Sequence, residues 1–287
     1  MKSRELGLVL ARQLMQVEDL HYGYWETGEK PSLTNLAQAQ ARFSEMLIGR
    51  IGEFVKPGGR ILDIGCGTGN LLVQLLAQGY EVDGLIPDTY LESQVRERLS
   101  TYNGTYQPTI FSEKFEQLGD RSDLDAYDLL LFSESFQYIP YVQSVALWPG
   151  LMKPDGQVMI CDFFKSQHDG DEGPGDGTFR GGHVYDEFLK YIQVQDIPVL
   201  LNEDITSKTS PSIELLDDLL MNRAKPALNS IDEYLEARRP ILRKLGKWLF
   251  RRNIKRVQTK YLSGHRSKAT FERYKTYRLM VLKPAST

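Results

Sequence analysis

The chain has 287 residues, of which 41% are hydrophobic and 25% charged, and its formal net charge is −3. These fractions are ordinary for a globular protein, and the length fits one large α/β domain with insertions or a domain plus a cap. No apolar run is long enough to span a membrane, and residues 1–10 lack the layout of a signal peptide, so we expect a cytoplasmic protein. The only cysteines, Cys66 and Cys161, fall at the ends of predicted buried strands, which indicates free thiols in a reducing compartment.

The small net charge conceals an asymmetry along the chain. From Arg223 onward there are 18 Lys and Arg against 4 Asp and Glu, a net charge of +14, so the remainder carries −17. This division favours either a basic face that docks on the acidic body or a surface for an anionic partner.

The first segment predicts a helix over residues 1–20, because apolar residues recur there at helical spacing. An aromatic cluster, His21–Trp25, follows it, and Ser32 or Thr34 can cap a second helix that runs through Ile51. The cluster would serve either as a hydrophobic plug or as a lid over a cationic ligand, since electron-rich ring faces attract cations.

A glycine-rich turn organises the rest of the chain. Residues 61–64 read as a short buried parallel strand, and residues 71–77 predict a helix. Gly65, Gly67 and Gly69 alternate between them, so the backbone can turn sharply and lie against a ligand. Asp63 places a carboxylate at the same point. Together these features indicate the nucleotide-binding corner of a doubly wound sheet.

The spacing of this turn distinguishes among nucleotides. Asn70 stands where a dinucleotide fingerprint requires its third glycine, and no lysine follows Gly69, as a phosphate loop would require. The run from Asp63 to Gly69 instead resembles motif I of the class I S-adenosylmethionine (SAM) methyltransferases. The His21–Trp25 cluster resembles the segment before motif I in small-molecule methyltransferases of the tocopherol and sarcosine/dimethylglycine type.

The resemblance implies SAM as the cofactor. In this family the acidic residue and the glycine turn hold the methionine end, and here the tyrosines of the aromatic cluster would cover the cofactor. The residues expected to bind it are Tyr22, Tyr24, Asp63, Gly65, Gly67, Gly69, Asn70, Ile86, Pro87, Asp88, Phe115, Glu116 and Ser133.

The second strand, residues 80–86, departs from the family pattern. The family's acidic residue, which accepts hydrogen bonds from both ribose hydroxyls, aligns with Ile86, and an isoleucine side chain accepts none. Either Asp88 reaches back, or backbone and water hold the ribose, or SAM binds weakly. Asp88 would otherwise only cap the helix predicted over Thr89–Ser100.

The third strand is predicted over residues 108–111. In the family the loop after this strand closes on adenine with a polar side chain and an apolar neighbour. Phe115 and Glu116 are the pair expected there, although an ordinary solvated loop fits almost as well.

The fourth and fifth strands, residues 126–132 and 157–164, supply two candidate general bases. Glu134 follows the fourth strand, in a loop that faces the methyl donor in the family. Its carboxylate would deprotonate an attacking hydroxyl or amine, or else bond loop amides. Asp162 lies near the end of the fifth strand and is the second candidate.

A loop over residues 165–183 leaves the edge where a substrate would enter. Its six glycines and a proline preclude regular structure, so we expect a long mobile loop that gates the substrate, with an ordinary disordered loop as the alternative. Arg180 is available for an anionic group, and His183 is a third candidate base. The spacing of the acidic residues and histidines in this loop fits neither a calcium-binding loop nor a pair of histidines on a helix, so no metal site is expected.

Residues 211–275 are expected to form a helical insertion between a sixth strand within residues 192–206 and a seventh over 277–282. Within it a helix ends before Pro226, and Ser230 caps the next.

Residues 241–257 of this insertion place apolar residues along one helical stripe with basic residues around it. The pattern favours a helix that buries its stripe on the domain over a helix on a membrane surface. A nucleic-acid partner is not expected, because no stacking aromatic residues accompany the charge.

We therefore expect an α/β fold: a doubly wound, seven-stranded, mostly parallel sheet with an N-terminal helical lid and a helical cap. The expected divisions are a lid (1–55), a SAM-binding core (56–210), the cap (211–275), and the last strand with its tail (276–287).

The expected activity is methyl transfer from SAM to an oxygen, nitrogen or carbon atom of a small molecule. The substrate contacts assigned are Trp25, Gln137, Tyr138, Arg180, Tyr261, His265 and Arg266. The alternatives are a protein of the same fold that binds SAM or a related ligand without methylating, and a peripheral membrane protein that modifies a lipid. The oligomeric state is left open.

Overall fold

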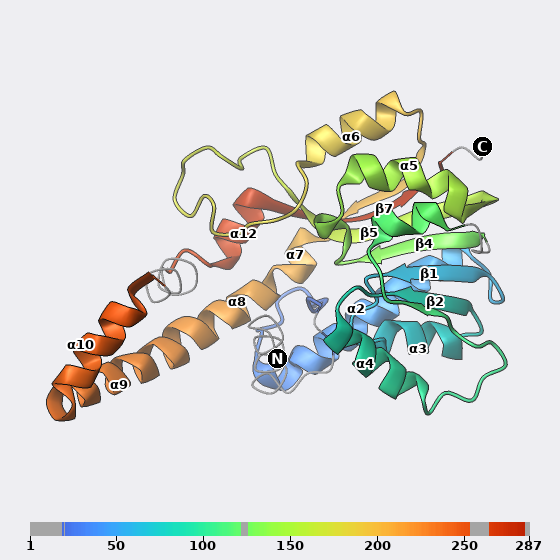
Figure 1. Cartoon of the computed structure of the whole chain (residues 1–287). Coiled ribbons are helices and arrows are strands. Elements are labelled where there is room, and N and C mark those ends of the chain that lie inside the picture. The colour runs from blue at the N-terminus through green and yellow to red at the C-terminus, as the bar shows by residue number, and fades with distance from the viewer. Residues whose placement is uncertain (1–18, 20, 122–125, 253–263, 285–287) are drawn as a thin grey trace.

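The computed structural model describes residues 19, 21–121, 126–252 and 264–284. The helix predicted over residues 1–20 therefore lies almost entirely outside the described residues. A seven-stranded sheet forms the centre of the molecule, in the order β3-β2-β1-β4-β5-β7-β6 (Figure 1). Its strands are β1 (Arg60–Ile64), β2 (Glu81–Leu85), β3 (Ile110–Phe111), β4 (Tyr127–Ser133), β5 (Met152–Lys165), β6 (Val199–Asp204) and β7 (Lys275–Leu282).

Strands β1 to β5 are parallel, and β7 runs antiparallel between β5 and β6. The chain crosses over at β1 and β4, so the two halves of the sheet wind in opposite directions. The expected doubly wound, mostly parallel fold is confirmed.

Both faces of the sheet are buried along most of β1, β2, β4, β5 and β7, which explains the continuous apolar runs in these strands, whereas β6 at the edge is largely exposed. In β4, Leu129 and Leu131 pack in one core cluster, and Leu130 and Phe132 in the other, because successive side chains point to opposite faces. Helices α2, α3 and α4 supply the first cluster, and α5 and α6 the second. The bounds of these helices are Leu33–Phe54 (α2), Asn70–Ala77 (α3), Thr89–Leu99 (α4), Tyr141–Leu151 (α5) and Tyr185–Val194 (α6).

Short helical turns connect several strands. They are η1 (Phe115–Asp120), η2 (Phe136–Tyr138), α7 (Thr206–Thr209) and α12 (Lys268–Tyr274). Because β6 runs in the same direction as β5, it ends at the same edge of the sheet as the glycine turn after β1. Helix α7 follows β6 there and leads into the cap.

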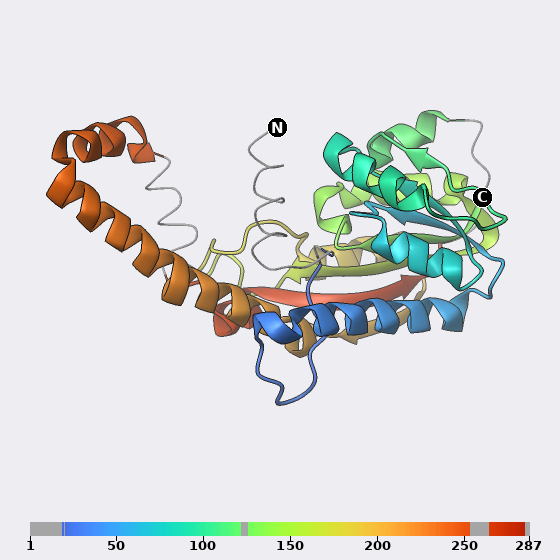
Figure 2. The same ribbon diagram turned by 90° about the horizontal axis from the view of Figure 1, so that it is seen from below.

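The cap is a long helical arm that extends away from the sheet (Figures 1 and 2). It consists of α8 (Pro211–Asp218), the π-helical turn η3 (Leu219–Ala224) and α9 (Lys225–Arg238), after which α10 (Pro240–Leu249) folds back along α9. The predicted break at Pro226 is wrong. Pro226 lies in the first turn of α9 directly after the π-helical turn, and the first turn of a helix tolerates its missing N–H. The predicted cap at Ser230 is also wrong, since Ser230 lies inside α9.

The apolar stripe of α10 does not pack on the domain, so that prediction is wrong for the described part of the stripe. Ile241 is 80% exposed and Trp248 67%, because the arm carries α10 away from the sheet. Among the described residues no helix is both long and apolar enough to cross a membrane.

Candidate functional site

The turn after β1 is held by backbone conformations that favour glycine. Gly65, Gly67 and Gly69 have φ of 79°, 58° and 79°, in the left-handed region. A Cβ on Gly65 would lie 2.5 Å from the Cβ of Ser135, so the loop after β4 packs against this glycine. A Cβ on Gly67 would meet nothing within 4 Å. Gly67 is therefore the point at which backbone is open to a ligand.

Asp63 adds a buried carboxylate immediately before this turn. It is 2% exposed, and its Oδ2 has no hydrogen-bond partner. Burial raises the pKa of Asp63 to about 7. A buried carboxylate oxygen without a partner costs free energy, and a cationic ligand group would supply what it lacks. The ammonium group of SAM fits this requirement, so the residues present agree with the expected cofactor.

The end of β2 supplies no second carboxylate of this kind. Ile86 is 5% exposed and packs in the core cluster beside α4, while its N–H donates to the carbonyl of Phe111. Pro87 is exposed. Asp88 is the N-cap of α4, with Oδ1 accepting from the N–H groups of Tyr90 and Leu91. The capping role weighed for Asp88 is therefore present in the structure.

Asn70 joins the turn to the segment before α2. Its Nδ2 donates to Oδ2 of Asp19 at 2.7 Å. Asp19 also lies 3.6 Å from Nε2 of His21, and the pKa of Asp19 is lowered because hydrogen bonds to His21 and Asn70 outweigh the effect of burial. Asp19 thus connects the start of the aromatic cluster to the glycine turn.

The first residues of the aromatic cluster form a packed cover. His21 stacks on Phe43 with ring centroids 4.6 Å apart. Tyr22 lies among the rings of Phe163, Phe271 and Tyr277, and this burial raises the pKa of its hydroxyl.

Tyr24 and Trp25 attach the cluster to α2 and α8. The Tyr24 N–H donates to the carbonyl of Ala39 on α2. Trp25 is 1% exposed, and its Nε1 donates to Ser212 on α8. The structure thus places Trp25 in the interior, in agreement with the hydrophobic plug weighed for this cluster.

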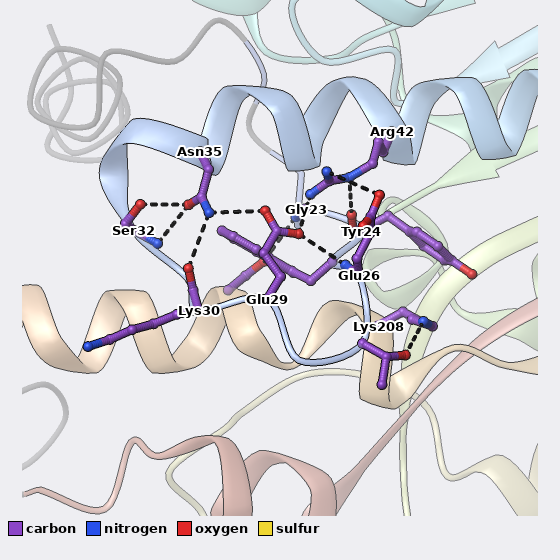
Figure 3. Close-up of polar contacts among 12 residues, drawn as sticks. Gly23, Tyr24, Glu26, Glu29, Lys30, Ser32, Asn35, Arg42 and Lys208 are labelled. Atoms are coloured by element: carbon purple, nitrogen blue, oxygen red, sulfur yellow. Dashed lines mark hydrogen bonds and ion pairs between the residues drawn. The ribbon is translucent and has the colours of Figure 1, made fainter.

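The loop from the cluster to α2 is fastened by ion pairs and side-chain hydrogen bonds (Figure 3). Arg42 on α2 bonds the carbonyl of Tyr24 and pairs with Glu29, while Asn35 donates to Glu29 and accepts from the N–H of Ser32. Because Asn35 satisfies the N–H of the N-cap residue, one set of contacts caps α2 and holds the loop.

Glu134 connects this cover to the sheet. It has φ of 54°, which is uncommon outside glycine. Its Oε1 accepts from the N–H of Tyr22 and from the hydroxyl of Tyr277. Burial raises its pKa, opposed by the positive charge of nearby His21. Of the two roles weighed for Glu134, the bond to a backbone amide is present, although the amide belongs to the cover.

Asp162 is fully buried, and its oxygens are engaged. Oδ2 accepts from the N–H of Gln137, and Oδ1 from the Gln137 side chain and the N–H of Phe163. Burial raises its pKa to about 8. These bonds hold the loop after β4. They also pair the side chain of Gln137 with that of Asp162. Tyr138, the next residue, is 70% exposed.

The loop after β5 brings His183 against η2. Nε2 of His183 lies 3.0 Å from the carbonyl of Phe136, and its ring packs edge-to-face with the rings of Phe136 and Tyr141. Arg180 is exposed. Rather than lying loose, the loop is fastened to α12, where Asp171 accepts from Arg273 and Tyr274.

The remaining predicted residues divide between core and surface. Phe115 is buried against Phe132, and Glu116 is half-buried in η1. Ser133 ends β4 beside Cys161. Arg266 lies over the ring of Phe179, 5.0 Å from its centroid. His265 is exposed, and Tyr261 lies outside the described residues.

Three residues of the site were not singled out from the sequence. Asp19 fell within a predicted helix, His21 was treated only as part of the aromatic cluster, and Tyr277 only as part of a strand. The hydrogen bond from Tyr277 to Glu134 spans 143 positions, and no local pattern marks such a contact.

Comparison with known proteins agrees with the geometry. Residues 36–203 match the family described as a methyltransferase domain. An O-methyltransferase, resE of Aspergillus sclerotiorum, is 27% identical over 155 residues, which make up 52% of this chain and 55% of that protein. The chain thus spans about half the length of this curated relative.

Solved structures show the same fold. A proposed sarcosine dimethylglycine methyltransferase from Galdieria sulphuraria has a TM-score of 0.69 at 15% identity, with 96% of this chain and 97% of that chain covered. The cyclase SpnF has a TM-score of 0.62 at 15% identity, with 100% and 97% covered. Since the family match extends over more than half of the chain, and the sheet order and glycine turn agree with it, this protein belongs to the methyltransferase domain family.

Proposed function

We propose that this protein transfers a methyl group from SAM to an oxygen, nitrogen or carbon atom of a small-molecule acceptor. The observation that carries the proposal is the buried Asp63 carboxylate, with one oxygen unpartnered, directly before the open backbone at Gly67. Family membership supports the same assignment. The two buried, unpaired cysteines support a reducing compartment, and we propose a cytoplasmic location.

SAM, when bound, supplies a methyl group made electrophilic by its sulfonium. The protein's tasks are then to bind, to orient and to exclude water. Asp63 would take the cationic ammonium group, and N–H groups of the glycine turn would take the carboxylate. Tyr22 and its neighbouring rings would keep water from the methyl donor, since they form a packed cover anchored to β4 and β7.

A base is needed only if the acceptor arrives protonated. His183 is a candidate on geometric grounds. The Phe136 carbonyl can only accept, so Nε2 of His183 donates to it, and Nδ1 is the ring nitrogen left to face an acceptor. Glu134 is the second candidate, because burial raises its pKa and so makes its carboxylate a stronger base than an exposed glutamate. Arg180 and Arg266 remain proposed substrate contacts.

Calorimetry with SAM tests the cofactor site. Asp63→Asn keeps the size of the side chain but removes its charge, and we expect affinity to fall by about tenfold or more. Asp88→Asn is the matched control, since asparagine caps a helix as well as aspartate does. Unchanged affinity in Asp88→Asn would limit Asp88 to capping. Absence of SAM binding in the wild-type protein would overturn the proposal.

A second candidate is a protein that binds SAM without methylating. Ile86 favours it, because no carboxylate stands at the end of β2 to accept from the ribose. Release of S-adenosylhomocysteine separates the two. Tight SAM binding without release, across a panel of phenols, amines and carbon acids, would favour the second candidate.

A further inference from the structure

Helix α10 presents an apolar stripe that no described element covers. The large apolar side chains of this helix are between 49% and 80% exposed: Ile241 80%, Leu242 59%, Leu245 49%, Trp248 67% and Leu249 58%. They fall on one side of the helix, because their spacing follows the helical repeat. A contiguous exposed patch of this kind marks an interaction surface.

The opposite side of α10 is occupied by ion pairs to α9. Arg243 pairs with Asp232 at 2.7 Å and with Glu236 at 2.8 Å, and Lys247 pairs with Asp232 at 2.9 Å. A helical hairpin in water ordinarily buries its apolar residues between its two helices. Here charged residues join the helices, and the apolar side of α10 faces away from α9.

The segment that carries this stripe has charge of a single sign. Residues 240–252 contain five Lys and Arg and no Asp or Glu. Two of the cations pair with α9, whereas Lys244, Arg251 and Arg252 are exposed. The occupant of this surface must therefore combine an apolar interior with negative charge at its boundary.

We propose that α10 docks this protein on an anionic lipid membrane. The apolar stripe would enter the boundary between headgroups and acyl chains, with Trp248 at the depth that tryptophan favours. Lys244, Arg251 and Arg252 would lie among the acidic headgroups. The helix would lie on the surface, in agreement with the absence of a spanning helix among the described residues.

A second copy of the chain fits this surface less well. A symmetric dimer formed through α10 would bring the same patch together from both copies. The exposed cations of α10 would then oppose each other, because Asp232 and Glu236 of α9 lie on the other side of α10, paired with Arg243 and Lys247. Acidic lipid headgroups neutralise them instead. This inference does not rest on methyl transfer, since docking requires only the arm.

Trp248 provides a built-in probe of docking. The chain has three tryptophans, and the other two, Trp25 and Trp148, are 1% and 0% exposed. A blue shift in fluorescence on adding vesicles would therefore report transfer of Trp248 from water. The vesicles are phosphatidylcholine alone or phosphatidylcholine with phosphatidylserine, and co-sedimentation of the full-length protein gives an independent measure.

We expect the protein to sediment with the phosphatidylserine vesicles, less at high salt, and not with phosphatidylcholine alone. Trp248→Glu should weaken binding by about tenfold or more, because it removes apolar area and adds a repelled charge. Trp248→Phe should keep sedimentation but lose the blue shift. Val194→Glu, at a residue 77% exposed on α6, is the matched control and should bind like the wild type.

Three outcomes would overturn the proposal. The first is no sedimentation of the wild type with phosphatidylserine vesicles. The second is equal sedimentation of Trp248→Glu and wild type. The third is a wild-type dimer that Trp248→Glu converts to monomers without any vesicle binding, which would assign the stripe to a second copy. Circular dichroism and thermal unfolding confirm that each variant is folded, which is expected because all the substituted side chains are exposed.

Discussion

One carboxylate oxygen of Glu134 accepts a hydrogen bond from the backbone N–H of Tyr22 at 2.8 Å. The same oxygen accepts from the hydroxyl of Tyr277 at 2.7 Å. Glu134 thereby joins the aromatic cover, the end of β4 and the last strand. Its left-handed backbone conformation is costly for a residue other than glycine, which supports a functional constraint at this position. The geometry favours a positioning role for Glu134.

Substitution of Glu134 separates positioning from proton transfer. In Glu134→Gln the amide oxygen can still accept both hydrogen bonds, so SAM affinity should stay within about threefold of wild type. Glu134→Ala leaves the N–H of Tyr22 without its acceptor, and affinity should fall by about tenfold. Calorimetry measures both. Turnover of Glu134→Gln near the wild-type rate would support positioning, whereas loss of turnover with intact affinity would make Glu134 the base.

The two glycines of the turn should respond differently to alanine. At Gly65 a Cβ collides with Ser135, so Gly65→Ala should lose about 2 kcal/mol or more of folding free energy. Gly67→Ala has open space and should lose only about 1–2 kcal/mol from its left-handed conformation. It should nevertheless abolish SAM binding, because the added methyl group would occupy the open space that we assign to the ligand. Urea unfolding and calorimetry measure the two effects, and normal SAM binding by Gly67→Ala would contradict the assigned site.

Asp162 should make stability depend on pH. Its pKa is raised from 3.8 to about 8, so between these values the folded state holds a proton that the unfolded state has released. This contribution to stability is complete at low pH and is lost as pH rises toward 8.

In Asp162→Asn this part of the slope should disappear. The amide nitrogen would face an N–H donor, so stability at low pH should also fall by about 1–3 kcal/mol. Urea unfolding at a series of pH values measures both effects. An unchanged slope would show that Asp162 titrates normally in the folded protein.

Substitution of Trp25 should change the free energy of unfolding more than the binding of the acceptor. Trp25→Ala empties a buried site and should cost about 3–5 kcal/mol, whereas Trp25→Phe retains most of the volume and should cost about 1–2 kcal/mol. Urea unfolding followed by circular dichroism measures this. The KM for an acceptor should be unchanged in Trp25→Phe. A large rise in KM at normal stability would instead support contact between Trp25 and the substrate.

The sequence by itself determined the fold and the place of the cofactor turn. Strand periodicity, the alternating glycines and Asp63 are local patterns, and local patterns are set by a few neighbouring residues. The strands were therefore anticipated within a few residues, apart from the earlier start of β5 and from β6, which was placed only within residues 192–206. Glu134, Asp162 and His183 became candidates through their places after or near the ends of these strands, and their catalytic roles stay predictions.

Only the tertiary structure decided what these residues contact. Glu134 meets Tyr22 and Tyr277, and Asp162 meets Gln137, across large separations in sequence, so their partners depend on how the layers pack. The same holds for α10. Its stripe predicts an amphipathic helix, but whether the apolar side is covered depends on where the arm places it. The helical arm continues through the π-helical turn before Pro226 and extends away from the sheet, and α10 remains exposed.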